Sequence, residues 1–313
     1  MVKTRFLLLT LLFALSVAAF MTLGARGNWD FILPFRGMKL LALVTIATAV
    51  ALSTMVFQTL TANRILTPSI MGFDALYLML QTGLVFFLGG FGFATLDPTL
   101  KFTLETALML TAALILFGTV LRNAADLSRM VLTGLILGVF FRSLTALINR
   151  LIDPSEFSVV QQASFARFNA VNADLTWIAT GITLAVFLWL MRQHRALDVI
   201  SLGREAAINL GVDHDRATKR LLVAIALLVS VSTALVGPIV FFGLLVSALT
   251  HRIIGTWRHA ALLPASALIA ATVLIASQTL FERALRLQTS VSVVIEALGG
   301  LVFLFLILHR RPR

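Results

Sequence analysis

LLALVTIATAVALSTMVFQTL, residues 40–60, contains only apolar residues, Ser, Thr and one Gln. Its length is close to the ~20 residues that an α-helix needs to cross the hydrocarbon core of a bilayer. The stretch also lacks the alternation of apolar and polar residues that marks a strand of a membrane β-barrel. Residues 40–60 therefore predict a transmembrane helix.

Nine further apolar segments repeat this pattern along the chain. Apolar residues make up 59% of the 313 residues and charged residues 12%, which is about half the charged fraction of a soluble domain. We expect an all-α, polytopic membrane protein with about ten transmembrane helices, forming one domain over residues 1–313. The third and eighth segments are short for a full span. The ten segments are residues 6–23, 40–60, 75–89, 102–121, 130–147, 175–191, 221–236, 239–249, 260–281 and 291–308.

The positions of the basic residues predict the orientation. With the N-terminus in the cytoplasm, most of the 25 Lys and Arg residues fall in cytoplasmic loops, and the C-terminus is cytoplasmic too. The net charge of +11 then needs no nucleic acid as a partner. Residues 6–23 follow Lys3 and Arg5, as in a signal peptide, but the apolar run is longer than usual, so we expect it to remain as the first helix.

The residues that carry enzyme chemistry are scarce. The chain has no Cys, no P-loop motif and no HExxH motif, so we expect no catalytic residue, no metal ligand and no cofactor site. All five His residues fall in predicted cytoplasmic loops or at the C-terminal helix end, where we expect them to be solvated or at headgroup level. They are His194, His214, His251, His259 and His309.

Few ionisable residues fall within or at the edges of the apolar segments: Asp74, Glu105, Arg142 and Glu296. We expect Asp74 and Glu105 to lie in the first turns of their helices, where carboxylates satisfy free N–H groups. Glu296 lies deeper. It should face the translocation path or a second permease chain, or else make a structural hydrogen bond, and Gly299 and Gly300 allow close helix approach nearby. So few buried carboxylates disfavour the alternative of an ion-coupled secondary carrier for an organic solute.

Two stretches predict broken helices. TPSIMG, residues 67–72, contains Pro68 and Gly72, and VGPIVFFG, residues 236–243, contains Gly237, Pro238 and Gly243. Pro and Gly interrupt helical hydrogen bonding, and the freed backbone groups need protein or water around them in a bilayer.

The most polar stretch is LGREAAINLGVDHDRATKR, residues 202–220. Between Gly203 and Gly211 it predicts a short helix with Glu205 near its start and an apolar face, flanked by glycines that permit turns. The helix is too short to span a membrane. It lies on the inner leaflet or docks a cytoplasmic partner. The apolar face consists of Ala206, Ala207 and Leu210.

This stretch resembles the pattern L-G-x-E-x-A-x-x-L-G-V of the iron-chelate and vitamin B12 permeases, which are ten-helix type II ABC importers. Four further blocks resemble the family in the same order: RGMKLLALVTIATAVALSTMVFQTL from Arg36, NRILTPSIMG from Asn63, GPIVFFGLLVSALTHRIIG from Gly237, and SVVIEALGGLVFLFLIL towards the C-terminus.

The resemblance implies a permease subunit that imports a chelate, with ATP hydrolysed on separate ATPase subunits. A periplasmic or lipid-anchored binding protein would deliver the cargo, and a second permease chain would complete the path, a paralogue more often than an identical copy. The helix that couples to the ATPase would contain Gly203, Arg204, Glu205, Ala206, Leu210 and Gly211. Docking of the binding protein would use Arg36, Lys39 and Arg283. The path or subunit interface would include Asn63, Pro68, Gly72, Asp74 and Glu296.

Several departures narrow the resemblance. Arg64 replaces the Pro after Asn63, Ser247 and Ala248 replace a Pro-His pair, and Leu301 replaces the Pro of the last helix. TANRILTPSIMGFDALY, FNAVNADL and VVIEALGG look instead like the branch that carries catecholate siderophores, such as the vibriobactin, petrobactin and anguibactin systems. The cargo implied is therefore a ferric catecholate siderophore.

Overall fold

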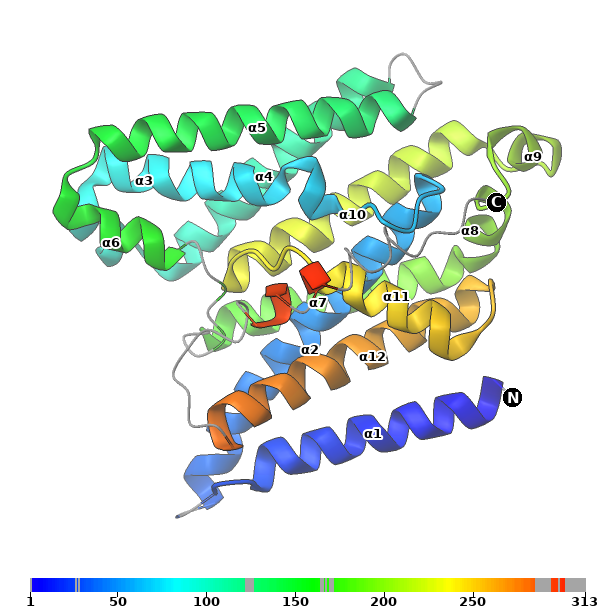
Figure 1. Ribbon diagram of the computed structural model, residues 1–313, viewed down its shortest axis with the longest axis horizontal. Coiled ribbons are helices and arrows are strands. Elements are labelled where there is room, and N and C mark those ends of the chain that lie inside the picture. Colours follow the sequence, from blue (N-terminus) through cyan, green and yellow to red (C-terminus); the bar gives the residue numbers. More distant parts are fainter. Residues whose placement is uncertain are drawn as a thin grey trace.

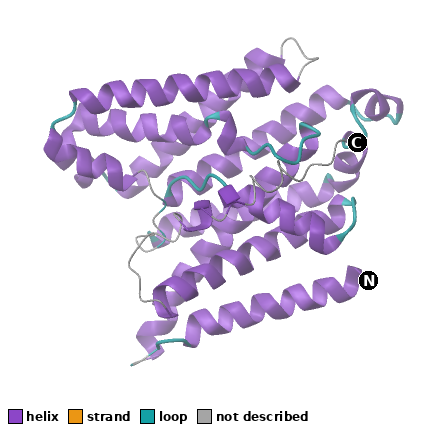
Figure 2. Ribbon diagram, viewed as in Figure 1, coloured by secondary structure: helices purple, strands orange, loops and turns teal. Residues whose placement is uncertain are grey.

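The computed structural model describes residues 2–25, 27, 29–121, 127–163, 166, 168, 172–284, 294–297 and 299–301. Within these ranges every regular element is a helix and no strand occurs (Figure 2). Eight helices of the described part of the chain are long and apolar enough to cross a membrane. They are α1 (Val2–Thr22), α2 (Trp29–Leu60), α3 (Phe73–Thr95), α4 (Pro98–Leu121), α5 (Leu127–Leu151), α7 (Ala173–Arg192), α10 (His214–Val236) and α12 (His259–Thr279).

Shorter helical elements connect or interrupt the long ones. The all-α membrane fold is thus confirmed, and the short eighth segment is α11. Most of the predicted tenth segment, residues 291–308, lies outside the described residues. The shorter elements are the 3-10 turn η1 (Pro68–Met71), α6 (Pro154–Ala163), α8 (His194–Ile200), α9 (Arg204–Asn209), α11 (Phe242–Ile254) and the π-helical turn η2 (Leu280–Ala284).

The predicted third segment, residues 75–89, ends at a kink within α3. Gly89 has φ 71° and ψ 163°, and a second helical stretch continues beyond it to Thr95. The freed amide of Gly90 donates a hydrogen bond of 2.8 Å to Glu156 Oε1 of α6. A side chain on a neighbouring helix, Glu156, therefore replaces the broken backbone bond.

The turn before α6 is closed by Asp153. Hydrogen bonds from the Ser155 hydroxyl and amide lower the pKa of this exposed carboxyl.

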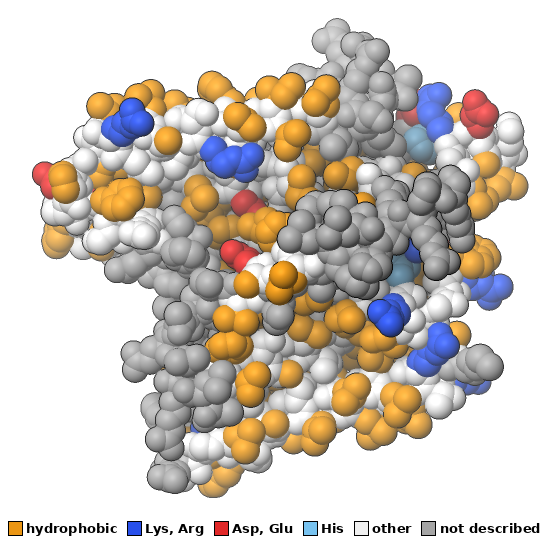
Figure 3. All heavy atoms as spheres, viewed as in Figure 1, with side chains coloured by type: hydrophobic (Ala, Val, Ile, Leu, Met, Phe, Trp, Pro, Cys, Tyr) orange, Lys and Arg blue, Asp and Glu red, His pale blue; other side chains and the backbone are white. Residues whose placement is uncertain are grey.

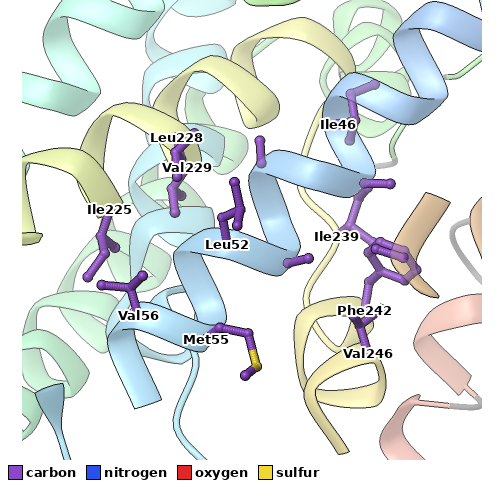
Figure 4. Packing of buried hydrophobic residues seen from close by; sticks show 14 of the residues in the cluster. Ile46, Leu52, Met55, Val56, Ile225, Leu228, Val229, Ile239, Phe242 and Val246 are labelled. Atoms are coloured by element: carbon purple, nitrogen blue, oxygen red, sulfur yellow. The ribbon is translucent and has the colours of Figure 1, made fainter. Parts of the chain in front are cut away.

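Helix α2 forms the centre of the molecule. It contacts α7, α10, α11 and α12, and in Figure 4 its apolar side chains lie between Ile225 and Val229 of α10 on one side and Phe242 on the other. Lipid tails are as apolar as Leu, so association of these helices depends on close packing more than on the removal of apolar surface from water. Small residues let the neighbours approach, and α2 buries Ala42, Ala47, Ala49 and Ala51.

The remaining helices surround this centre. Helix α1 packs against α12, α4 against α10, and α3 against α5 and α6 (Figure 1). Apolar side chains cover much of the outward surface in Figure 3, as expected for contact with lipid. Exposed examples on α1 and α5 are Leu7, Leu11, Leu15, Leu132, Ile136 and Phe140.

The N-terminal end of α1 lies at the same end of the molecule as α8 and α9 (Figure 1). Arg5 Nη1 donates a 2.6 Å hydrogen bond to the Ile254 carbonyl, where α11 ends at Gly255 in the left-handed region. Basic side chains are visible at this end in Figure 3. We call it the α9 end.

The contact between α2 and α11 depends on a glycine. A Cβ added at Gly243 would overlap the Thr54 side chain. We expect Gly243→Ala to lower the stability of the detergent-solubilised protein by ~1–3 kcal/mol, because overpacking displaces well-packed neighbours. Thr54→Ala in the same background should restore part of the loss, measured by thermal unfolding. Gly181→Ala is the control, because a Cβ there meets nothing within 4 Å. Equal unfolding temperatures for Gly243→Ala and the control would contradict this account.

Candidate functional site

The short helix α9 stands between two glycines, as the sequence predicts. Gly203 and Gly211 have φ values of 97° and 82°, in the region that favours glycine. At the C-terminal end the Val212 amide donates to the Ala207 carbonyl and the Gly211 amide to the Ile208 carbonyl. This pair of bonds is a Schellman motif, which satisfies the last carbonyls of a helix. The loop therefore holds a defined six-residue helix.

The outward face of α9 is apolar. Ala207 is buried and Ala206 half-buried, whereas Leu210 and Ile208 are 62% and 50% exposed. The predicted apolar face is thus divided, with alanine against the protein and the larger side chains outside. Arg204 and Glu205 are exposed beside them, and Arg204 lies 3.4 Å from Asp215, a surface ion pair of small energetic weight. Leu202 and Trp257 are also exposed at the α9 end.

The two predicted helix breaks meet at one cavity, although they are far apart in the sequence. Pro68, Ser69 and Asp74 line it from the first break, and Gly237 and Ile239 from the second. The other lining residues come from α2 and α10, and several carry hydroxyls. They are Ile46, Val50, Ser53, Thr54, Val229, Ser232 and Thr233.

The first break is held against α5 by glycines. Gly72 has φ 96° and precedes α3, and a Cβ there would lie 2.7 Å from the Gly138 Cα. One turn away, a Cβ at Gly134 would lie 2.9 Å from the end of Met71. The spacing Gly134-x-x-x-Gly138 thus lets backbone approach backbone, as small residues do in membrane helices.

Each break has a carboxylate beside it. Asp74, in the first turn of α3 as expected, is buried and faces the Ser69 hydroxyl, with Arg142 and Glu296 near enough to interact electrostatically. Glu296 is half-buried and accepts a hydrogen bond from the Val240 amide in the second break. This bond fits the structural alternative considered for Glu296. Gly299 allows the close approach, since a Cβ there would lie 2.5 Å from the Phe241 Cβ.

Glu105 lies at a different place in its helix from the one predicted, and Asn63 bonds within its own turn. Glu105 is not in a first turn, because α4 begins earlier, at Pro98. Its buried carboxylate accepts a 2.7 Å hydrogen bond from Gln81 of α3 and lies 3.9 Å from Lys101. Asn63 Oδ1 accepts from the Ile65 amide, so it shapes the turn after α2.

The predicted docking residues make contacts within the chain. Arg36 is 5% exposed and donates to the carbonyls of Phe20, Met21 and Leu23 at the end of α1. Lys39 Nζ lies 2.9 and 2.8 Å from the two carboxylate oxygens of Glu282. These internal contacts give both charged side chains a structural role. Docking of the binding protein through Arg36 and Lys39 remains a prediction. The Arg283 side chain lies outside the described residues.

The prediction of solvated histidines was wrong for two of them. His214 and His259 are buried, and His309 lies outside the described residues. His259 bonds to Asp198 and Thr59, a polar contact that sequence spacing could not reveal because the three residues lie on separate elements. Across the ranges that the structure describes, no group of three or more His, Asp or Glu side chains is arranged to hold a metal ion.

Comparison with known proteins gives one family and close relatives. The FecCD transport family matches residues 6–309. The petrobactin import system permease protein YclO of Bacillus subtilis (strain 168) is 42% identical over 283 residues, 90% of each chain. FatC of Bacillus anthracis, also a petrobactin import system permease protein, is 32% identical over 277 residues, 88% of this chain and 78% of that protein.

A solved structure has the same fold. It is described as an inward-facing conformation of a metal-chelate type ABC transporter, and it superposes with a TM-score of 0.84 over 99% of this chain and 100% of that chain. The sequences are 20% identical, so this likeness concerns the fold alone.

The Gly72 contact makes a direct prediction. Gly72→Ala adds left-handed strain of ~1–2 kcal/mol and pushes a Cβ into the α5 backbone, which cannot move aside as a side chain can. With overpacking included, we expect a loss of ~2–5 kcal/mol in thermal unfolding. Gly83→Ala, on α3 in open space, is the matched control and should unfold like the wild type. A Gly72 variant as stable as this control would show that the contact is not tight.

Proposed function

The chain belongs to the FecCD transport family, and we propose that it is the membrane-spanning subunit of an ATP-driven importer of a ferric siderophore of the catecholate type. The observation that carries this proposal is the 42% identity, over 90% of both chains, to a petrobactin import permease. The protein is a multi-pass protein of the bacterial inner membrane, with ATP hydrolysed on a separate chain.

Helix α9 is the element that we assign to the ATPase. Its backbone is fixed at both ends, whereas Leu210, Ile208 and Leu202 expose apolar surface next to the charges of Arg204 and Glu205. An apolar centre with a charged rim is the usual composition of a protein interface. The alternative of a helix resting on the inner leaflet would use the same apolar side chains, so the experiment below separates the two. This assignment puts the α9 end, and with it the N-terminus, in the cytoplasm.

The exposed surface of α5 is the reason for proposing a second permease chain beside this one. Only 11% of its membrane-spanning window is buried inside the chain. Arg142 lies within this helix and is exposed, next to Gly138 and close to Asp74. A guanidinium turned to lipid at this depth is costly, so the surface is better covered by a partner subunit or an aqueous path. We propose that the path runs along α5 and the cavity at the two breaks, past Pro68, Gly72, Asp74 and Glu296, and that the partner is a paralogue.

The opposite end of the molecule would receive the cargo from a periplasmic or lipid-anchored binding protein. Arg36, Lys39 and Arg283 lie in the elements at this end. Arg36 and Lys39 are buried, so they would act on docking mainly through the positive charge that they place at this end, which affects the rate of docking.

Uptake by a reconstituted complex tests the function. The permease, its partner chain and the ATPase are placed in proteoliposomes with the binding protein, and iron-labelled ferric petrobactin is supplied. We expect uptake that requires ATP and is unaffected when ion gradients are collapsed. Uptake that follows an ion gradient without ATP would contradict the proposal and favour a secondary carrier.

Variants of α9 test the coupling assignment. Leu210→Asp and Glu205→Arg should abolish ATPase stimulation by the binding protein and weaken co-purification of the ATPase, because they place charge in the contact. Membrane insertion and thermal unfolding should be unchanged, since both side chains are exposed. Val2→Asp is the control, because Val2 is exposed at the same end of the molecule but lies on α1, away from α9. Normal coupling in both α9 variants would exclude α9 from the ATPase contact.

A further inference from the structure

Three polar side chains, of which His259 is buried and Asp198 and Thr59 are half-buried, join three helices at the α9 end. The Nδ1 atom of His259 lies 2.7 Å from Asp198 Oδ1, and its Nε2 atom lies 2.7 Å from Thr59 Oγ1. Asp198 is on α8, Thr59 is in the last turn of α2, and His259 is the first residue of α12. The ring is 3% exposed. We call these residues the Asp198–His259–Thr59 chain.

The positions of the protons keep the chain intact in either form of His259. Thr59 Oγ1 is also 2.9 Å from the Met55 carbonyl, and a hydroxyl has a single hydrogen. If that hydrogen is donated to Met55, Thr59 accepts from Nε2–H of a doubly protonated ring. If it is donated to Nε2, the ring is neutral and donates from Nδ1 to Asp198. Both contacts of the ring persist in each case.

Helix capping alone does not explain the arrangement. Asp198 Oδ1 also accepts a 2.7 Å bond from the backbone amide of His259, at the start of α12. A carboxylate in this place satisfies a free N–H group of the helix N-terminus. The cap would need neither the imidazole nor a hydroxyl on α2. The ring extends the contact from α8 through the start of α12 to α2.

The Asp198–His259–Thr59 chain lies between α9 and the centre of the fold. Residues Ser201–Gly203 join α8 directly to α9, and α9 contacts α8 and α10. On the other side, α2 and α12 lie against each other and are joined again at their far ends by the ion pair of Lys39 and Glu282. The middle of α2 lines the cavity where the two breaks meet.

We propose that the Asp198–His259–Thr59 chain is the rigid link by which movement of α9 reaches α2 and α12. The link rests on the proposed function, because it presupposes that the ATPase moves α9. Asp198, His259 and Thr59 are then positioning residues, which transmit a displacement and do not touch the cargo.

The uptake assay with the assembled importer provides the test. The measured quantity is the ratio of ferric petrobactin accumulated to ATP hydrolysed. Thr59→Val keeps the shape of the side chain and removes the hydroxyl, and His259→Phe keeps a planar ring and removes both contacts of the ring nitrogens. We expect uptake per ATP to fall about fivefold or more in both, the scale of a typical coupling between two sites. Thr59→Ser should restore the wild-type ratio.

Thr61→Val is the matched control. Its hydroxyl donates 2.9 Å to the Phe57 carbonyl within the same helical turn, so its loss should leave the ratio unchanged. A normal ratio in Thr59→Val and His259→Phe would overturn the link. It would also be overturned if the ratio fell only in step with the thermal unfolding temperature, because the side chains would then support the fold alone.

A second readout does not depend on the cargo. The chain has no Cys, so single cysteines at Leu151 and Leu280, both exposed, can carry spin labels. ATP should change the distance between the labels in the wild type and in Thr61→Val, and the change should be lost in Thr59→Val. If ferric petrobactin is not transported but the ATP-driven change remains and depends on Thr59, the proposed cargo is wrong and the link stands. An equal change in Thr59→Val and the wild type would reject the link.

Discussion

The constraint on which this structure depends is that backbone N–H and C=O groups inside a bilayer must find partners within the protein. Long helices meet it alone, but α3 and the segment around Gly237 do not. At the α3 kink the freed Gly90 amide is bound by Glu156, and in the Gly237 segment the Val240 amide is bound by Glu296. Glu156 and Glu296 thus bind amides at breaks in the backbone, whereas the buried Glu105 bonds to Gln81 of a neighbouring helix.

Helix α2 can hold the centre because residues 40–60 offer an uncharged surface with small residues. Lys39 and Thr59 then bind it to α12 near its two ends, through Glu282 and His259 respectively. Between these ends the contacts are apolar and close, and Gly243 fits directly against Thr54. Two helices joined in this way move together more readily than apart. The neighbouring breaks supply the places where the backbone can adjust.

The elements of the fold could be predicted from the sequence wherever a local pattern determines them. The span of α2 follows from its apolar run, and α9 follows from two glycines around a short amphipathic stretch. Contacts between distant segments could not be predicted in this way. The two breaks could be predicted from the sequence, but the cavity that they share could not. Glu105 was misplaced because Pro98 starts α4 earlier than the apolar run does, and His259 was misplaced because its burial depends on where α8 lies.

Hydroxyl groups explain how α2 is apolar by composition and still makes polar contacts with its neighbours. The Thr180 hydroxyl donates 2.7 Å to the Thr176 carbonyl of its own helix, so the 2.8 Å contact with Thr45 uses the Thr45 hydrogen and a free lone pair of Thr180. A threonine that bonds to its own helix needs no partner, so it costs little when a neighbour moves away. A contact of this kind, such as the one between Thr45 of α2 and Thr180 of α7, can separate at little cost, whereas a buried charge in the same place would leave an unpaired ion.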